Sequence, residues 1–383
     1  MWKGAAASAV PAPRLADMTA AQLISFARGA PSIDIVDVAG LKAAAARAFD
    51  LDPVAVTGYG PGTGYPPLRE WIAARHGVTA DQVLITNGSL QADAFIFEHL
   101  INPGDEVVVE KPTYDRTLLN LRTLGAKVHQ VSLDRDGINI DELRRLLESG
   151  VRPKLAHIIP NFQNPAGMTL SLPRRQALVA LAREYEFTIF EDDPYVDIRF
   201  RGEPLPSMLS LDDPAHPTVV AAGSFTKTVC PGVRVGYLIG PVAMINDIAK
   251  KAVNTYISPN MLSEVTVHQF CVSGDIDRSI ATVCEALGRR ASLLAAALRR
   301  DIPGCRFEEP DGGYFLWVEL PDDIDVDALA PAATARGVAV VKGSDFLLEG
   351  GRQGLRLAYS AVLTDQVDEG VRRLAAAIAD VRG

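Results

Sequence analysis

The sequence predicts an α/β protein in which a mostly parallel sheet is sandwiched by helices, with a smaller α+β domain beside it. From about residue 80, short runs rich in β-branched residues alternate with amphipathic segments, which is typical of a sheet covered on both faces. After residue 260 the pattern changes to long helical segments with two strand-like runs between them. With 383 residues, of which 48% are hydrophobic, the chain can bury a large core.

Seven short apolar runs bounded by turn residues are expected to form the large sheet. They span residues 83–86, 106–110, 127–131, 155–160, 187–191, 219–222 and 235–239. Helical periodicity between them predicts helices over 91–100, 116–124, 140–148 and 173–185, the last with Pro173 in its first turn. The C-terminal part is expected to form helices over 263–272, 276–300 and 364–381, and strands over 313–319 and 354–358.

Composition and charge argue against several classes of function. The net charge of −9, without a compensating block of lysine and arginine, argues against a nucleic-acid-binding surface. The four cysteines lack metal-ligand spacing, so we expect reduced thiols and no metal. No apolar run approaches the ~20 residues that span a bilayer. Residues 1–20 are broken by Pro11 and Pro13 and do not resemble a signal peptide, so we expect a cytoplasmic protein.

Lys227 is the most informative residue of the chain. It lies between two strand-like runs, with Ser224 before it and Arg234 after it. A lysine amine has a pKa near ~10.4, and it becomes a useful nucleophile toward an aldehyde when burial or a neighbouring cation lowers that pKa. The apolar flanks and Arg234 are expected to supply both effects. This segment is therefore suited to Schiff-base chemistry.

Two adjacent acids, Asp192 and Asp193, follow the predicted strand 187–191. Open α/β sheets bind their ligands at this end of the strands. Successive side chains of a strand point to opposite faces, so only one acid can meet a ligand, and the residues leave the choice open. A helix cap or a solvated turn is the alternative interpretation of such a pair.

Three further segments are each weak on their own. Asn164, followed by Pro165, marks a turn. The glycine-rich segment around Tyr59 is a surface turn by composition, without the spacing of a dinucleotide-binding loop. Arg356 lies inside an apolar strand, where a guanidinium needs an anionic partner, and a structural salt bridge is the alternative to a ligand there.

Taken in their order along the chain, these segments resemble the class I/II aminotransferases, pyridoxal-phosphate enzymes of fold type I similar to aspartate aminotransferase. The resemblance extends from about residue 24 to the C-terminus, and it implies pyridoxal 5'-phosphate held by Lys227 as an internal aldimine. We expect an N-terminal arm with part of the small domain over residues 1–48. A large cofactor-binding domain is expected over 49–270, and a C-terminal small domain over 271–383.

The resemblance implies four contacts to the cofactor ring. Asp192 is implied to pair with the ring nitrogen, and a carboxylate there keeps that nitrogen protonated, so that the ring accepts electrons. Tyr195 and Asn164 are implied to hold the phenolic oxygen from two sides. Tyr114 is implied to stack on the ring, which fixes its tilt.

The cofactor phosphate is implied to lie at the helix start formed by Ser89 and Leu90. Free N–H groups and the helix dipole attract anions at such a terminus. Ser224, Thr226 and Arg234 are implied to complete the phosphate site, since an arginine can bind phosphate through two parallel hydrogen bonds.

The resemblance also implies how substrate is bound. Arg356 is implied to hold the substrate α-carboxylate, together with Asn164, beneath an N-terminal loop that contains Gly29. Tyr59 is implied to reach the phosphate of a neighbouring subunit, so that a homodimer shares its active sites.

The activity implied by the resemblance is transfer of an amino group from an L-amino acid to a 2-oxo acid through a pyridoxamine phosphate intermediate, with Lys227 moving the proton. Apolar, aromatic or aminoadipate-like substrates are expected, with 2-oxoglutarate as acceptor. β-Elimination, cyclisation and oxidation of an amino acid remain alternatives, because they share the first carbanion. A ligand-sensing transcription regulator is another, but it needs a helix-turn-helix module, and fewer than thirty residues precede Gly29.

Overall fold

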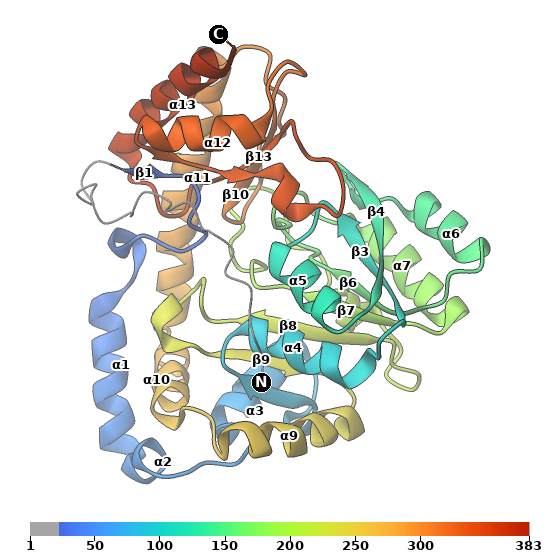
Figure 1. Cartoon of the computed structure of the whole chain (residues 1–383). Coiled ribbons are helices and arrows are strands. Elements are labelled where there is room, and N and C mark those ends of the chain that lie inside the picture. The colour runs from blue at the N-terminus through green and yellow to red at the C-terminus, as the bar shows by residue number, and fades with distance from the viewer. Residues whose placement is uncertain (1–22, 383) are drawn as a thin grey trace, which may run out of the picture.

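The computed structural model describes residues 23–382, and its largest element is an eight-stranded sheet (Figure 1). In sheet order the strands are β2 (Val83–Thr86), β9 (Gly236–Ile239), β8 (Val219–Ser224), β7 (Thr188–Asp192), β6 (Pro153–Ile158), β3 (Glu106–Lys111), β4 (Lys127–Asp134) and β5 (Gly137–Ile138). From β8 to β4 neighbouring strands are parallel, whereas β9 is antiparallel to both its neighbours and β5 is antiparallel to β4. The predicted α/β fold with a mostly parallel sheet is confirmed.

Helices cover both faces of the sheet because alternate strand residues feed two apolar cores. Val107 and Val109 of β3 belong to the core under α4 (Ser89–Leu100), α5 (Asp115–Thr123) and α9 (Val242–Tyr256). Val108, between them, belongs to the opposite core under α6 (Ile140–Glu148) and α7 (Leu172–Tyr185). Strands buried on both faces read as continuous apolar runs, which is why the sequence reveals them clearly.

The seven predicted strands and four predicted helices of this part are all present, with ends that move by a few residues. The helices α1 (Val38–Leu51), α2 (Pro53–Thr57), α3 (Pro66–His76), α8 (Met208–Leu211) and α9 were not predicted. Most of them are short or lie ahead of residue 80, where the strand and helix alternation that guided the prediction has not begun. Among residues 23–382, none of the helices has both the length and the apolar sequence needed to cross a bilayer.

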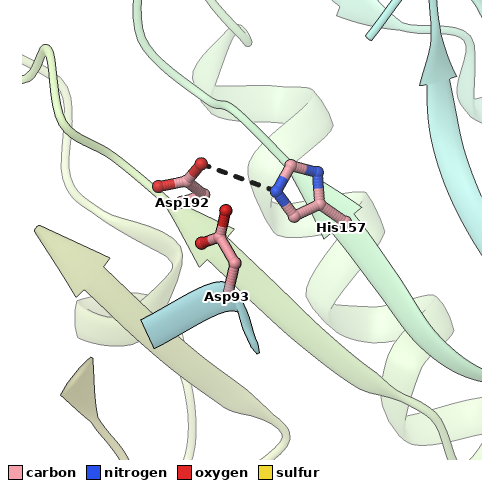
Figure 2. A group of neighbouring side chains, drawn as sticks. All are labelled: Asp93, His157 and Asp192. Carbon is pink, nitrogen blue, oxygen red and sulfur yellow. Dashed lines mark ion pairs between the residues drawn. The ribbon is translucent and has the colours of Figure 1, made fainter. Parts of the chain in front are cut away.

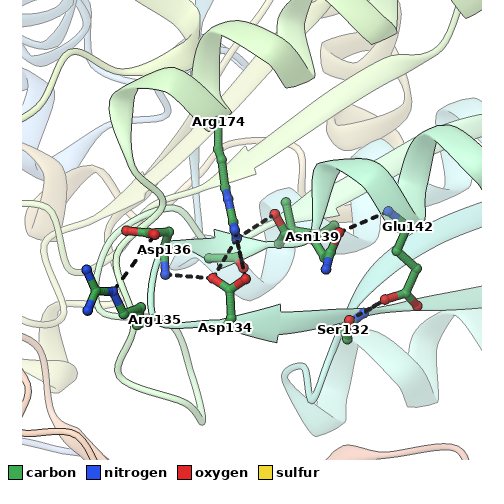
Figure 3. A network of polar contacts seen from close by, with 9 residues as sticks. Ser132, Asp134, Arg135, Asp136, Asn139, Glu142 and Arg174 are labelled. Carbon is green, nitrogen blue, oxygen red and sulfur yellow. Dashed lines mark hydrogen bonds and ion pairs between the residues drawn. The ribbon is translucent and has the colours of Figure 1, made fainter.

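Polar contacts hold strand β5 in place at one edge of the sheet (Figure 3). Arg174 of α7 donates to both carboxylate oxygens of Asp134 at 2.7 Å and to the backbone oxygen of Gly137. The side chain of Asn139 caps α6 by accepting from the backbone N–H of Glu142. These contacts give the edge strand fixed partners, which protects it from pairing with another chain.

A second core is built mainly from the C-terminal part of the chain. Its three-stranded antiparallel sheet has the order β10 (Phe315–Glu319), β13 (Gly354–Ala358) and β12 (Val341–Lys342). The helices that contribute to this core are α11 (Asp275–Asp301), α12 (Val326–Ala335) and α13 (Val367–Arg382), whereas α10 (Met261–Val272) is buried in a core of the large sheet. The predicted helices and strands here are therefore present, while α12 was not predicted.

The N-terminal segment packs into two different cores. Strand β1 (Ile24–Ser25) pairs in parallel with β11 (Val338–Ala339), and Phe26 is buried in the C-terminal core. Helix α1 instead packs along α10, with Ala44 and Ala48 in a core of the large sheet. The predicted domain limits of 1–48, 49–270 and 271–383 stay a prediction, and residues 1–22, with the predicted leader, lie outside the described part.

Strand β9 lies directly against the start of α4, and this close contact requires glycine at position 236. A Cβ atom on Gly236 would lie 2.6 Å from the backbone carbon of Gly88 and 2.7 Å from the backbone nitrogen of Ser89. Backbone atoms cannot move aside as a flexible side chain can. Gly236 therefore fixes how closely the sheet approaches this helix terminus.

We predict that Gly236→Ala lowers the free energy of unfolding by about 1–3 kcal/mol, the range of overpacking in a filled core. Gly240→Ala, just beyond the other end of β9, is the matched control, because its Cβ would meet no atom closer than 3.4 Å. Denaturant unfolding of both variants measures the difference. Equal losses in the two would contradict the steric explanation.

Candidate active site

A cavity of about 360 Å³ lies where the parallel strands of the large sheet end. Much of its lining comes from the ends of β7 and β8 and from residues that follow β2, β3, β6 and β8, because parallel strands place their carboxyl ends at one edge. Gly29, Phe315 of β10 and Arg356 of β13 complete it. Twelve of the thirteen predicted site residues line this cavity: Gly29, Ser89, Leu90, Tyr114, Asn164, Asp192, Tyr195, Ser224, Thr226, Lys227, Arg234 and Arg356.

Tyr59 is the predicted site residue that does not line the cavity. Its side chain belongs to a residue that is 86% exposed in this single chain. Five lining residues were not predicted: Asp115, Arg116, Ile159, Pro194 and Phe315. Asp115 and Arg116 follow Tyr114 directly and Pro194 precedes Tyr195, so chain proximity was an available signal for these three. Ile159 and Phe315 are ordinary apolar core residues in sequence.

The amine of Lys227 is buried in the cavity. Its Nζ donates to the backbone oxygen of Gly29 at 3.1 Å and lies 4.9 Å from the ring centre of Tyr314. Burial, followed by the charge of Arg356, lowers the pKa of Lys227 to about 8, against the opposing effect of Asp192. The sequence predicts Arg234 as the neighbouring cation, but Arg356 has the larger effect in the structure.

The strand end places one acid in the cavity. Asp192 lines it, whereas Asp193 accepts a 2.6 Å hydrogen bond from the side chain of Asn161 and does not. The Oδ2 atom of Asp192 lies 3.5 Å from Nε2 of His157 (Figure 2). Its Oδ1 atom is buried and has no hydrogen-bond partner among the described residues. A buried, unpaired carboxylate oxygen needs a donor, so this atom indicates a ligand.

Arg356 is buried, and no acid pairs with it within the described part of the chain. Its guanidinium donates to Oδ1 of Asn164 at 3.1 Å and to the backbone oxygen of Ala27 at 2.9 Å. It lies 4.4 Å from the ring centre of Phe315, and its Nε is unpaired among residues 23–382. The structural salt bridge that the sequence left open is not formed there. A buried cation without an anion is suited to binding one.

The part of the cavity at the start of α4 has the geometry of an anion-binding site. Helix α4 begins at Ser89 with its free N–H groups at the cavity wall. Arg234 donates to the backbone oxygen of Asn87 at 2.8 Å, which holds its guanidinium beside this terminus. Gly88 has a φ of 75°, which disfavours other residues, and a Cβ there would lie 2.4 Å from Nη2 of Arg234. Ser224 accepts from the backbone N–H of Thr226 at 3.1 Å.

Two tyrosines of the cavity keep their phenol protons at neutral pH. Burial raises the pKa of Tyr195 well above its usual value. Burial and the charge of Asp115 raise the pKa of Tyr114 to about 12. Both hydroxyl groups therefore remain hydrogen-bond donors across the physiological range.

The loop that carries Asn164 is held by buried polar side chains. Gln163 donates to Glu110 at 3.0 Å and accepts from the backbone N–H of Ala166 at 2.8 Å. Arg175, which is fully buried, donates to the backbone oxygen of Pro160 at 3.2 Å. Burial raises the pKa of Glu110 to about 8, despite these hydrogen bonds. These buried side chains, which do not line the cavity, thus hold the loop of Asn164 in place.

The cavity combines an amine, an unpaired carboxylate oxygen, an anion-binding helix terminus and an unpaired guanidinium. These groups fit an aromatic aldehyde that carries a phosphate and a basic ring nitrogen, together with a carboxylate substrate. Pyridoxal phosphate has that chemistry.

Comparison with known proteins places the chain among enzymes of this kind. The family model for aminotransferase class I and II matches residues 21–374. The aromatic-amino-acid aminotransferase 1 of Thermococcus litoralis is 33% identical over 370 residues, which cover 93% of this chain and 88% of the relative. The 2-aminoadipate transaminase of Thermus thermophilus is 32% identical over 359 residues, covering 93% and 90%.

Solved structures agree with these relatives. The Pyrococcus horikoshii kynurenine aminotransferase, in complex with PMP, has a TM-score of 0.89 at 32% identity, covering 94% of this chain and 91% of its own. The α-aminoadipate aminotransferase LysN of Thermus thermophilus, complexed with N-(5'-phosphopyridoxyl)-L-leucine, has a TM-score of 0.89 at 31% identity, covering 94% and 93%. Named relatives of this kind do not favour elimination, cyclisation or oxidation as the reaction. The chain belongs to the class I and II aminotransferases of fold type I, and it transfers amino groups with pyridoxal phosphate as cofactor.

Proposed function

We propose that the protein transfers the amino group of aromatic and 2-aminoadipate-like L-amino acids to 2-oxoglutarate. The observation that carries the proposal is one cavity that holds both the buried amine of Lys227 and the guanidinium of Arg356, which has no acid partner among residues 23–382. The amine of Lys227 is suited to proton transfer, and the guanidinium of Arg356 is suited to binding an α-carboxylate. The substrate class is supported by relatives named for aromatic amino acids, 2-aminoadipate and kynurenine, and by the aromatic wall formed by Tyr114 and Phe315.

When bound, pyridoxal phosphate supplies an electron-accepting ring that stabilises negative charge on the substrate Cα. In our proposal Asp192 offers its unpaired Oδ1 to the ring nitrogen, and Tyr195 donates to the phenolic oxygen. Asn164 donates to the same oxygen through its NH₂ group, because its Oδ1 already accepts from Arg356. Tyr114 covers the ring.

The phosphate in this proposal lies at the start of α4. The backbone N–H groups of Ser89 and Leu90 point to it, and Arg234 provides a charged partner held close to the same terminus. Ser224 and Thr226 close the site from the end of β8.

Lys227 is the proposed base. An amine whose pKa is about 8 is partly unprotonated near neutral pH, and it can take the α proton of the substrate on Nζ. Removal of the amine from water, together with the charge of Arg356, makes the amine available. Its backbone contact at Gly29 places Nζ beside the N-terminal segment, which we propose to cover the substrate.

Arg356 is proposed to orient the substrate through two parallel hydrogen bonds to its α-carboxylate. The rings of Phe315 and Phe346, with centres 4.4 and 4.9 Å from the guanidinium, restrict how it can turn. Gly29 leaves room for the aromatic wall, since a Cβ there would lie 2.6 Å from Phe315.

Tyr59 is proposed to serve the site of a partner subunit in a homodimer. Its exposure of 86% in the single chain is what this proposal explains. From the sequence we also propose a cytoplasmic location and domain limits at residues 48 and 270.

The reaction is tested by adding phenylalanine, kynurenine or 2-aminoadipate to the purified holoenzyme with and without 2-oxoglutarate. We expect keto acid and glutamate in equal amounts, formed continuously only with the acceptor. Lys227→Ala is expected to lower turnover by about 10²-fold or more, the range of a lost general base. Lys154→Ala, an exposed lysine on β6, is the control. Continuous ammonia release without acceptor would overturn the proposal.

Replacing Arg356 tests the carboxylate site. Arg356→Gln is expected to lower kcat/KM for phenylalanine by about 10- to 100-fold, the loss of hydrogen bonds to a charged group, and mainly through KM. The same variant is expected to change the reaction with phenethylamine, which lacks the carboxylate, far less. Arg352→Gln removes an exposed ion pair to Asp325 just ahead of β13 and serves as control. An equal loss with both substrates would argue against carboxylate binding by Arg356.

Shared sites are tested with heterodimers of Tyr59→Ala and Lys227→Ala chains. Each homodimer is expected to be impaired. If Tyr59 serves the partner's site, the heterodimer contains one site with both wild-type residues and recovers about half of wild-type activity per dimer. If Tyr59 serves its own site, every site of the heterodimer carries a defect and no recovery follows. A sedimentation mass of a single 41.1 kDa chain would also exclude the shared site.

A further inference from the structure

Behind the cavity, three titratable side chains meet in the apolar interior (Figure 2). Asp93 comes from the second turn of α4, His157 from β6 and Asp192 from the end of β7. One ligand atom of each lies within 4.8 Å of the other two. All three are buried, with exposures of 1%, 0% and 4%. Only Asp192 also lines the cavity.

The polar atoms of this cluster have too few partners. Among residues 23–382, Oδ1 of Asp93, Nδ1 of His157 and Oδ1 of Asp192 have no hydrogen-bond partner. Nε2 of His157 lies 3.5 Å from Oδ2 of Asp192 and 3.4 Å from the hydroxyl of Thr117. The rings of Phe97 and Phe190, centred within 5.9 Å of the histidine ring, keep the surroundings apolar. The three side chains therefore depend on one another for polar contacts.

Asp93 stands where packing alone would favour an apolar residue. Its neighbours on the same helix face, Ala92, Ile96 and Phe97, are fully buried core residues. A buried carboxylate without a cation is strongly disfavoured, so such a group keeps its proton instead. No lysine or arginine pairs with Asp93 in the described part of the chain. Burial, and then the charge of Asp192, raise the pKa of Asp93 well above its usual value.

The titratable groups around the cluster come from five segments of the chain. Asp192 on β7 and His157 on β6 face Asp93 directly. Tyr114, ahead of α5, has its pKa raised in part by both acids. Glu110 on β3 and Lys227 after β8 interact with Asp192, and Glu110 is itself held toward its neutral form by burial. The amine of Lys227 is thus the nearby cation, and it lies on the cavity side of Asp192.

We propose that Asp93 is a positioning residue for Asp192: it keeps its proton and directs it to the Asp192 carboxylate, while His157 faces the same group. Asp93 then adds no second negative charge beside Asp192. The inference deepens the proposed function and rests on it, because it takes Asp192 as the partner of the cofactor ring nitrogen. Asp93 touches neither cofactor nor substrate, and acts through Asp192.

The first test uses the cofactor-free protein, compared with Asp93→Asn. With a raised folded pKa, the folded state binds more protons than the unfolded state between pH 3.8 and that folded value, so stability falls as pH rises through this window. The midpoint of thermal unfolding of Asp93→Asn, relative to wild type, is therefore expected to rise from pH 5 to pH 8. Glu98→Gln, on the exposed side of α4, is the control. A difference that does not change with pH would overturn the proposal.

The second test measures cofactor binding and the visible absorption of the holoenzyme against pH. Asp93→Asn keeps a donor of the same shape, so its dissociation constant and spectrum are expected to remain close to wild type. Asp93→Leu removes the donor, and its dissociation constant is expected to rise about tenfold, as for one lost hydrogen bond to a charged group. Equal damage by both substitutions would overturn the proposed donor role. If Asp93→Leu fails to fold, the comparison of Asp93→Asn with wild type still decides.

The third test asks whether the cluster binds a metal instead. Two carboxylates and an imidazole are a plausible ligand set for Zn²⁺. Stabilisation of the cofactor-free wild type by Zn²⁺, absent in Asp93→Asn, would overturn the proposal, and no such difference supports it. Because the first and third tests need no cofactor, they remain decisive even if the assigned reaction fails in the substrate panel.

Discussion

The burial of two cations in one cavity is the constraint on which the site depends. The charge of Arg356 lowers the affinity of Lys227 for protons, and Asp192 is the acid that opposes this effect. Arg234 adds a third positive group at the start of α4. Two positive groups held away from water, with the exposed Arg234 nearby, favour the binding of anions. A phosphate and a substrate carboxylate are two anions of the right kind, and the protein supplies one binding place for each.

Polar groups that never enter the cavity hold this arrangement. Glu110 and Gln163 fix the loop of Asn164 from the sheet, and Arg175 binds the same loop from α7. Gly88 and Gly236 let a strand and an arginine approach the first turn of α4 closely. Each of these contacts joins segments that are distant in sequence. The precision of the site therefore rests on the sheet and its helices, more than on the loops that carry the lining residues.

The sequence predicts the sheet well because its strands are buried on both faces, and their composition reflects this. It also predicts most cavity residues, since they follow strand ends and belong to recognisable segments. It does not predict Asp93 and His157, which stand in unrelated apolar contexts and meet only through the pairing of β6 with β7 and the packing of α4. Nor can sequence rank Arg356 above Arg234 as the neighbour of Lys227, because 129 positions separate Lys227 from Arg356. The sequence also does not predict that the N-terminal segment packs into two cores.

The pairing of β1 with β11 has a mechanical consequence. Phe26 and Ala358 share a backbone hydrogen bond, Ala27 holds the guanidinium of Arg356, and Gly29 touches the amine of Lys227. The segment from Ile24 to Gly29 is thus fastened to the C-terminal core while it touches the reactive amine of the large sheet. Any shift of that core would carry the segment and Arg356 together, and the contact of Gly29 with Nζ would move with them. Six residues of chain thus couple the position of the Arg356 guanidinium to the surroundings of the amine.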